Sequence, residues 1–516
     1  MKTAPTAASQ WIISPAWDAA LFIGAPVTCA AMLLPISRLF PSNDYSFFLL
    51  AFFTFGHHLP GFLRAYLDKE LFRQYRLRFL LAPVLLFASA LWFDQRGLHG
   101  LLLFVFAWDI WHVLMQHFGF MRIYDAKTGE VDRWTSRMDW AVSISCYLSM
   151  IAASPHYRHN LFLQSFQSGF PLWLGGAYQF LQNALFACTG ALAAAYVGFC
   201  TLRWREGRLN ARKVALLAVF LAASWYLYVV YDDFIVGFAV WSAFHCLQYY
   251  AIVWVYNANR VAKGVSMAAL ARTLFRPTPA CIAAYGGLIL LYGGINYSRI
   301  LLGGADWVRF LVAFIATSNM LHYYYDGFIW KVREPKTRQS LGIAAAGNST
   351  ASPSWTTAGW VHAAAFSALI AALAWLENAR PNDDLAARRA LAVIAPQAEE
   401  AHLHLAESLR ARGSYGEAIG AYRESLRLKP ASLEAQLNLG VTLAVVGRTD
   451  QAIEAYQRVL ALDSSYAIAR FNLAGLLVIR GRTTEALRHY EAVLEAGDAQ
   501  TRELARQAIG SLNTSN

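Results

Sequence analysis

The chain contains 516 residues, of which 57% are hydrophobic and only 15% are charged, with a mean hydropathy of +0.34. Because a soluble domain of this size does not need so much apolar surface, this composition excludes a simple globular protein and predicts a polytopic membrane protein. The net charge of +11 lies in the first 379 residues, since the remainder holds equal numbers of acidic and basic side chains. A basic excess within a membrane domain indicates loop topology and no nucleic-acid partner.

Eleven apolar segments are close to the roughly 20 residues that a helix needs to cross about 30 Å of hydrocarbon. Their approximate bounds are 19–40, 45–66, 75–93, 98–121, 138–154, 176–202, 213–231, 234–257, 278–298, 306–330 and 357–377. Lysine and arginine cluster after every even-numbered segment, and the other loops hold few. By the positive-inside rule, the N-terminus is cytoplasmic and the chain after the last span is extracytoplasmic. The sequence therefore predicts a multi-pass integral protein of the lipid bilayer, which in a bacterium would be the cytoplasmic membrane.

Histidines and carboxylates lie inside four of these segments, the second, fourth, eighth and tenth. The candidate metal ligands are His57, His58, Asp109, His112, His117, His245, His322 and Asp326. Ionisable side chains are costly in a bilayer, so they usually face the bundle interior and mark a functional site. Measured from the cytoplasmic helix ends, the depths of the histidines differ by only about 6 Å. We therefore expect them to form one cluster.

The spacing of these residues pairs carboxylates with imidazoles. Asp109 and His112 are three residues apart, and His322 and Asp326 are four apart, so each pair shares a helix face. Imidazole with carboxylate suits a transition metal such as Fe, Mn, Zn or Cu; we favour iron, with haem as a variant. His117 lies about 140° around the helix from His112, so both can bind one metal only if the helix is distorted.

Aromatic residues flank the histidines along the same segments. The residues expected to line an apolar substrate channel are Trp108, Trp111, Tyr249, Tyr323 and Tyr324. The segment Gln116-His117-Phe118-Gly119 resembles the His-Phe-Gly element of the Brp/Blh carotenoid-cleaving membrane oxygenases. That resemblance implies a non-haem iron enzyme that uses oxygen on an isoprenoid-like or acyl substrate.

The C-terminal part repeats with a period of 34 residues. Three sets of residues recur at this interval: Gly413, Gly447 and Gly481; Ala418, Ala452 and Ala486; and Tyr422, Tyr456 and Tyr490. Small residues at matched positions let two antiparallel helices pack closely, and the glycine ends the first helix of each pair. The pattern resembles the tetratricopeptide repeat (TPR), which implies an α-solenoid whose concave face binds a protein or peptide partner.

The sequence therefore predicts an all-α chain in four regions. A polytopic membrane domain with histidine-bearing helices occupies 1–378, and a link with a partial repeat occupies 379–398. Three repeats follow at 399–500, and a capping helix with a tail occupies 501–516.

Two classes of function fit this organisation, and the sequence leaves open whether the protein is an enzyme. The first is a membrane-embedded, metal-dependent oxidoreductase that uses oxygen on an apolar, lipid-like substrate, with a partner-binding TPR module. The second is a non-enzymatic membrane scaffold or assembly factor that recruits partners through the repeats, with histidines that only satisfy hydrogen bonds. A lipid-linked glycosyltransferase is disfavoured because the first external loop is short, and a transporter lacks an obvious pair of broken helices.

Overall fold

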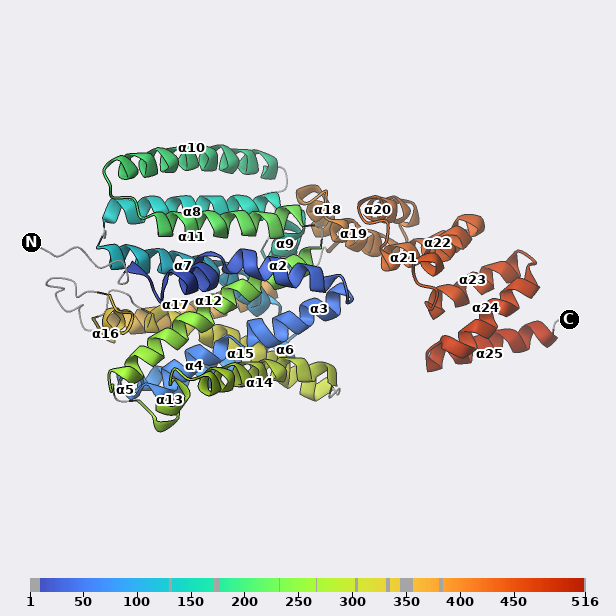
Figure 1. The fold of residues 1–516 in the computed structure, drawn as a ribbon. Helices are drawn as coiled ribbons and strands as arrows, with labels where there is room; N and C mark the ends of the chain where they lie inside the picture. The colour runs from blue at the N-terminus through green and yellow to red at the C-terminus, as the bar shows by residue number, and fades with distance from the viewer. Residues whose placement is uncertain are drawn as a thin grey trace, which may run out of the picture. The chain divides into compact units, whose positions relative to one another are not determined.

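The computed structural model describes residues 10–129, 132–170, 172, 177–231, 233–265, 267–301, 305–330, 335–343, 356–379 and 384–514. Within these ranges every regular element is a helix, which confirms the all-α prediction (Figure 1). The chain divides into two compact units. The first comprises Met1–Tyr157, Gln164–Pro171 and Gln179–Arg380, and the second comprises Arg158–Leu163, Leu172–Tyr178 and Pro381–Asn516.

The helices up to residue 378 include long apolar ones and short connecting ones. They are α1 (Pro15–Asp18), α2 (Ala25–Ser37), α3 (Ser42–Leu49), α4 (His58–Leu67), α5 (Lys69–Gln74), α6 (Arg76–Gln95), α7 (Gly100–Thr128), α8 (Arg133–Ala153), α9 (Pro155–Gln167), α10 (Tyr178–Arg205), α11 (Ala211–Trp225), α12 (Phe234–Ala262), α13 (Ala269–Leu274), α14 (Pro279–Leu301), α15 (Ala305–Ile329), α16 (Pro335–Ser340) and α17 (Thr356–Asn378). Three π-helical segments, η2 (Ala19–Ile23), η3 (Leu50–Phe55) and η4 (Tyr226–Val230), continue neighbouring helices.

Among the described residues, seven helical stretches are long and apolar enough to cross a membrane, and a pair bent by 60° (Pro15–Ile23 with Ala25–Ser37) would make an eighth. The predicted fifth, tenth and eleventh spans fall on α8, α15 and α17, which are outside this set. Polar side chains that turn toward the bundle interior, such as Asp139 in α8 and His322 in α15, lower the hydropathy of the first two. The number of eleven spans therefore stays a prediction.

Helix α12 is the most buried of these stretches, because 72% of its apolar segment is buried inside the structure. It packs against α2, α3, α4 and η3, and its Trp241 and Phe244 are almost fully buried. Helix α15 packs against α4, α6 and α7. The four segments that carry the predicted ligands therefore meet in the core of the first unit.

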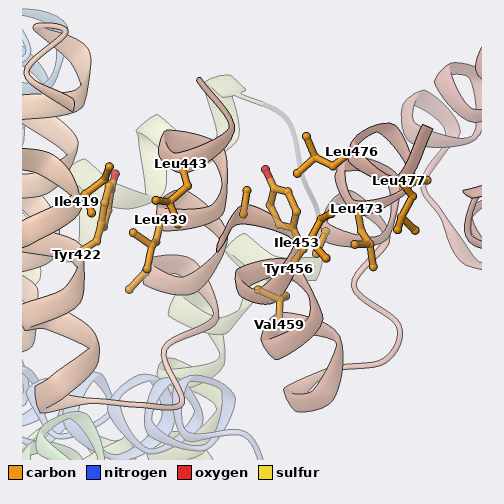
Figure 2. Packing of buried hydrophobic residues seen from close by; sticks show 14 of the residues in the cluster. Ile419, Tyr422, Leu439, Leu443, Ile453, Tyr456, Val459, Leu473, Leu476 and Leu477 are labelled. Atoms are coloured by element: carbon orange, nitrogen blue, oxygen red, sulfur yellow. The ribbon is translucent and has the colours of Figure 1, made fainter. Parts of the chain in front are cut away.

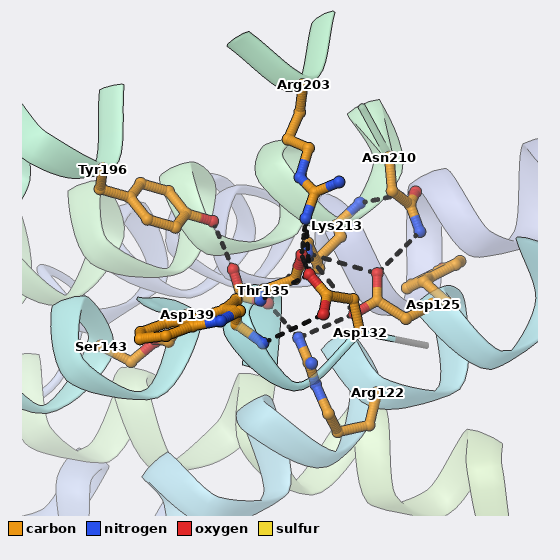
Figure 3. A network of polar contacts seen from close by, with 12 residues as sticks. Arg122, Asp125, Asp132, Thr135, Asp139, Ser143, Tyr196, Arg203, Asn210 and Lys213 are labelled. Carbon is orange, nitrogen blue, oxygen red and sulfur yellow. Dashed lines mark hydrogen bonds and ion pairs between the residues drawn. The ribbon is translucent and has the colours of Figure 1, made fainter. Parts of the chain in front are cut away.

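A buried network of charges joins α7, α8, α10 and α11 near one end of these helices (Figure 3). The Asp139 carboxylate is fully buried and accepts hydrogen bonds from Lys213 Nζ at 2.9 Å, Tyr196 Oη at 2.7 Å and the Arg122 guanidinium. Asp125 pairs with the same two cations, at 2.9 Å from Arg122 Nη2 and 3.3 Å from Lys213 Nζ. Because each buried charge has partners of the opposite sign, the network links these helices.

The second unit is a stack of short helices. They are α18 (Asp384–Ile394), α19 (Glu399–Ala411), α20 (Tyr415–Leu428), α21 (Leu433–Val445), α22 (Thr449–Leu462), α23 (Ala467–Ile479), α24 (Thr483–Ala496) and α25 (Ala499–Thr514). Each packs on the next in the chain, and one apolar core that includes Tyr422, Leu439, Tyr456 and Leu473 runs through the stack (Figure 2).

The recurring small residues have a physical role in this stack. Ala418 and Ala452 are fully buried where paired helices approach each other. A Cβ atom at Gly440 would lie 2.6 Å from Cε1 of the Tyr456 ring, so the helices are in close contact there. Gly447 ends α21 with a φ of 75°, in the left-handed region that favours glycine. At the start of α25, hydrogen bonds from the backbone N–H and hydroxyl of Thr501 hold the pKa of Asp498 below its usual value.

Candidate metal centre

Four buried imidazoles and one carboxylate converge in the core of the first unit. They come from the η3–α4 junction, α7, α12 and α15: His57, His112, His245, His322 and Asp326. Two overlapping triplets, His57/His112/His245 and His112/His322/Asp326, each offer three ligand atoms within 4.8 Å of one another. His112 is the one residue that belongs to both triplets.

The distances between these groups are those of ligands that share one ion. His322 Nε2 lies 3.0 Å from His57 Nε2 and 3.1 Å from His112 Nε2. Two nitrogens bound at about 2.1 Å and at a right angle would be about 3.0 Å apart. Asp326 Oδ2 lies 3.8 Å from His322 Nε2 and 3.9 Å from His112 Nε2, so the carboxylate completes one side of the cluster.

Hydrogen-bonding rules show that a cation fits this cluster. His57 Nδ1 donates to the Thr54 carbonyl, so His57 Nε2 carries a lone pair. His322 Nε2 has at most one hydrogen and cannot satisfy both of its close nitrogen neighbours. Both ring nitrogens of His245 are buried and lack a hydrogen-bond partner among the described residues. A metal ion would accept the lone pairs that these imidazoles point at one another.

Residues outside the two triplets contact the candidate ligands and fix their orientation. His58 stacks on the His322 ring, with centroids 4.9 Å apart, and its Nδ1 lies 2.8 Å from Ser318 Oγ. Ser318 Oγ is in turn 2.8 Å from Tyr292 Oη. The Tyr249 hydroxyl donates to Asp326 Oδ1 at 2.9 Å, which leaves Oδ2 facing the histidines. Such partners fix the orientation of a ligand and raise its basicity.

Three of the predicted ligands lie outside the two triplets: His58, which stacks behind His322, and also Asp109 and His117. Asp109 accepts a hydrogen bond of 3.2 Å from the Tyr323 hydroxyl, and it is in neither triplet. The His117 ring stacks on Phe220 with centroids 4.0 Å apart, on another face of α7. Its position agrees with the rotation of about 140° from His112 that an undistorted helix imposes.

The π-helical segment η3 positions the first two histidines, and sequence reasoning did not find it. It packs against α14 so closely that a Cβ at Gly293 would lie 2.6 Å from Phe52 Cα. A Cβ at Gly56 would lie 2.8 Å from the Ile289 carbonyl oxygen. Because η3 ends just before His57, this contact sets where that ring enters the cluster. The only sign of this contact in the sequence is the presence of glycines, Gly56 and Gly293, in two apolar segments.

Replacing Gly293 by alanine is expected to disturb the centre from the next helix. The added methyl group meets backbone atoms of Phe52 that cannot rotate away, so η3 must shift, at a cost of about 1–3 kcal/mol. The midpoint temperature of thermal unfolding should decrease, and so should the amount of transition metal that copurifies with the protein. Gly286→Ala in the same helix is the control, because its Cβ has nothing within 4 Å. Equal behaviour of the two variants would contradict this role of the contact.

A cavity of about 270 Å³ lies beside the cluster, between α7, α12 and α15. Four of the five aromatic residues expected along a substrate channel line it: Trp108, Trp111, Tyr249 and Tyr323. The fifth, Tyr324, packs against Phe366 of α17 instead. His112 and Asp326 form part of the wall, so the cavity reaches the candidate ligands. Trp330 and Leu341 also line it, and no pattern in the sequence predicts this for either residue.

The second unit has a groove of its own, with a volume of about 530 Å³, over α20, α21 and α22. Its lining includes Arg423, Arg427, Gln436, Gln451, Glu454 and Arg458. Three arginines and one glutamate give this surface an excess of positive charge.

Comparisons with known proteins identify the second unit. Residues 383–432 and 437–501 match a family model described as the tetratricopeptide repeat. The C-terminal module consists of tetratricopeptide repeats. No curated protein matches the chain. The family match begins at residue 383, so the resemblance of Gln116–Gly119 to the Brp/Blh oxygenases stays a prediction.

Solved structures also resemble part of the chain. Two crystal structures of MamA are each 25% identical to it and cover 24% of this chain, with TM-scores of 0.23 and 0.22. The match covers 77% and 72% of those two chains. YrrB, described as a TPR protein with an unusual peptide-binding site, is 18% identical, with 28% of this chain and 91% of that chain covered and a TM-score of 0.18.

Proposed function

We propose that the protein is a membrane-embedded, metal-dependent oxidoreductase that uses iron and oxygen on an apolar, lipid-like substrate. The observation that carries the proposal is the convergence of four buried imidazoles and Asp326 from four segments of the chain. Neutral imidazoles whose nitrogens lie about 3 Å apart cannot all form hydrogen bonds with one another, whereas a shared metal ion would accept a lone pair from each of them. Nitrogen and oxygen donors without thiolate suit non-haem iron.

The same distances favour non-haem iron over haem. Two imidazoles on opposite sides of a porphyrin iron would hold their nitrogens roughly 4 Å apart, twice a metal–nitrogen bond length. His322 Nε2 lies 3.0 and 3.1 Å from its two imidazole neighbours, too close for a macrocycle to pass between them. The cluster therefore suits adjacent ligands on a bare ion.

Different residues of the chain would bind the ion, hold a proton and line the substrate cavity. Bound iron would supply the activation of oxygen. His57, held by the Thr54 carbonyl, and His322, stacked on His58, keep their lone pairs aimed at one point. Tyr249 holds a hydroxyl proton on Asp326 Oδ1 at the cavity wall, where it can move toward a bound molecule. Trp108 and Trp111 of α7 would give that molecule an apolar wall.

The repeats support a second part of the proposal, a protein or peptide partner. TPR modules generally bind such partners, and the groove over α20–α22 offers a concave surface. By the positive-inside rule the repeats would meet this partner on the extracytoplasmic side. Without a metal, the same repeats would make the protein a membrane scaffold, which is the alternative function.

Oxygen consumption tests the proposed reaction class. We expect iron-loaded protein in lipid nanodiscs to consume oxygen when long-chain and polyene lipids are added, and His322→Ala to abolish this. A variant of the buried histidine outside the cluster, His117→Ala, should retain most of the activity, since its ring contacts Phe220. Loaded protein that consumes no oxygen with any of these lipids would favour the scaffold.

A further inference from the structure

The cavity beside the candidate centre follows one face of α7. The α7 residues along its lining recur at spacings of three and four and include Trp108, His112, Gln116, Gly119 and Ile123. That spacing keeps side chains on one helix face, and the first and last of these residues are about 22 Å apart along the helix. A volume of about 270 Å³ along this length describes a narrow, elongated space. Because His112 is near the start of this lining, most of the cavity extends from the candidate ligands toward the C-terminal end of α7.

Gly119 leaves open space in this wall. It follows His112 by seven residues, which is about 10 Å along the helix and only about 20° around it. A Cβ atom at Gly119 would have nothing within 4 Å. Met115 and Phe120 lie to either side of Gly119 around the helix and also line the cavity. A side chain at position 119 would therefore enter the cavity.

Packing between helices does not require a glycine at this position. At Gly56 and Gly293 a Cβ atom would meet backbone atoms of the neighbouring helix, which explains why those residues are small. Gly119 has no such neighbour, and glycine is less favourable than alanine inside a helix. What glycine preserves at position 119 is the open space in the cavity.

We propose that Gly119 determines which substrates the cavity accepts, because it leaves room for an unbranched hydrocarbon chain that runs past it from the candidate centre toward Ile123. This inference rests on the proposed function, whose lipid-like substrate it narrows to a molecule with an extended chain. Apolar side chains such as Met115, Phe120 and Ile252 would contact that chain along its length. Burial of apolar surface would hold the chain without a polar anchor.

The test compares two straight-chain hydrocarbons on metal-free, full-length protein in lipid nanodiscs, with binding to empty nanodiscs subtracted. Extended tetradecane must pass position 119, whereas octane fits on the His112 side of it. We expect Gly119→Leu to weaken the binding of radiolabelled tetradecane at least about tenfold and that of octane less than about twofold, since added bulk blocks only the longer chain. Gly119→Ala adds one methyl group and should leave the binding of both probes close to that of the natural protein.

A matched control separates this effect from general damage to the fold. Gly286 also lies inside an apolar helix with nothing within 4 Å of its Cβ position, but it does not line this cavity. Gly286→Leu should bind both probes as the natural protein does. Gly119→Met should show the same selective loss as Gly119→Leu, so that the result does not depend on one variant folding.

Three results would overturn the inference: no binding of tetradecane to the natural protein, unchanged tetradecane binding in the folded leucine and methionine variants, or an equal loss of both probes. A selective loss of tetradecane in a protein that never binds iron would instead refute the proposed function and leave the role of Gly119 standing.

Discussion

Replacing His112 by alanine is expected to reduce the affinity of the protein for iron at least tenfold, and to leave less than stoichiometric metal after purification. His112 is the one residue shared by both ligand triplets, and its Nε2 is 3.1 Å from His322 Nε2. Removing it takes a donor away from both triplets. Loss of a supporting residue alone typically costs a metal site 10- to 100-fold in affinity, so loss of a ligand should cost no less. Mass spectrometry of the metals after equilibration with Fe(II) measures the change.

The matched control for this prediction lies five residues away on the same helix. His117 is also buried, but its ring stacks on Phe220 and it belongs to neither triplet. His117→Ala should lower stability through a lost packing contact and leave the iron content near that of the natural protein. Iron lost equally from both variants would point to damage of α7 rather than to ligation.

Replacing Asp139 by asparagine is expected to destabilise the first unit by about 3–5 kcal/mol. The carboxylate is fully buried and is the common partner of Lys213, Arg122 and Tyr196. Asparagine keeps the shape but leaves the buried Lys213 and the partly buried Arg122 with Asp125 as their remaining carboxylate in this network. Thermal or denaturant unfolding in a fixed detergent would measure the loss as a lower midpoint.

Two comparisons show whether buried charge is the cause. Glu206→Gln removes a half-exposed carboxylate that lies 3.5 Å from Arg203, and such a surface pair contributes at most about 1 kcal/mol. Adding Lys213→Met to Asp139→Asn removes one uncompensated cation and should restore part of the stability. A double variant less stable than Asp139→Asn alone would contradict the charge explanation.

The histidine cluster could be anticipated because helix geometry converts sequence position into depth. The residues on different helices are brought together because they lie at one level, and His322 and Asp326 share a face at a spacing of four. The same geometry indicated that His117 points away from His112. The all-α character and the repeats could also be predicted, since a period of 34 residues with matched small side chains is typical of few folds other than the TPR.

The remaining features depend on lateral packing, which no periodicity encodes. Asp109 shares a face with His112, yet its carboxylate accepts a hydrogen bond from the Tyr323 hydroxyl of α15 and does not join the cluster. Whether Tyr324 faces the cavity or α17 is set by the rotation of α15 against its neighbours. The π-helical turn before His57 likewise arises only when the helices are assembled.

Elemental analysis of the natural protein tests the central claim most directly. The protein would be purified in detergent without chelators, and its metals would be counted beside an optical spectrum of the same sample. About one iron per chain without a Soret band is the result we predict from one cluster of histidine and carboxylate ligands. A Soret band would assign haem to these histidines, and the absence of any stoichiometric transition metal would contradict the metal centre altogether.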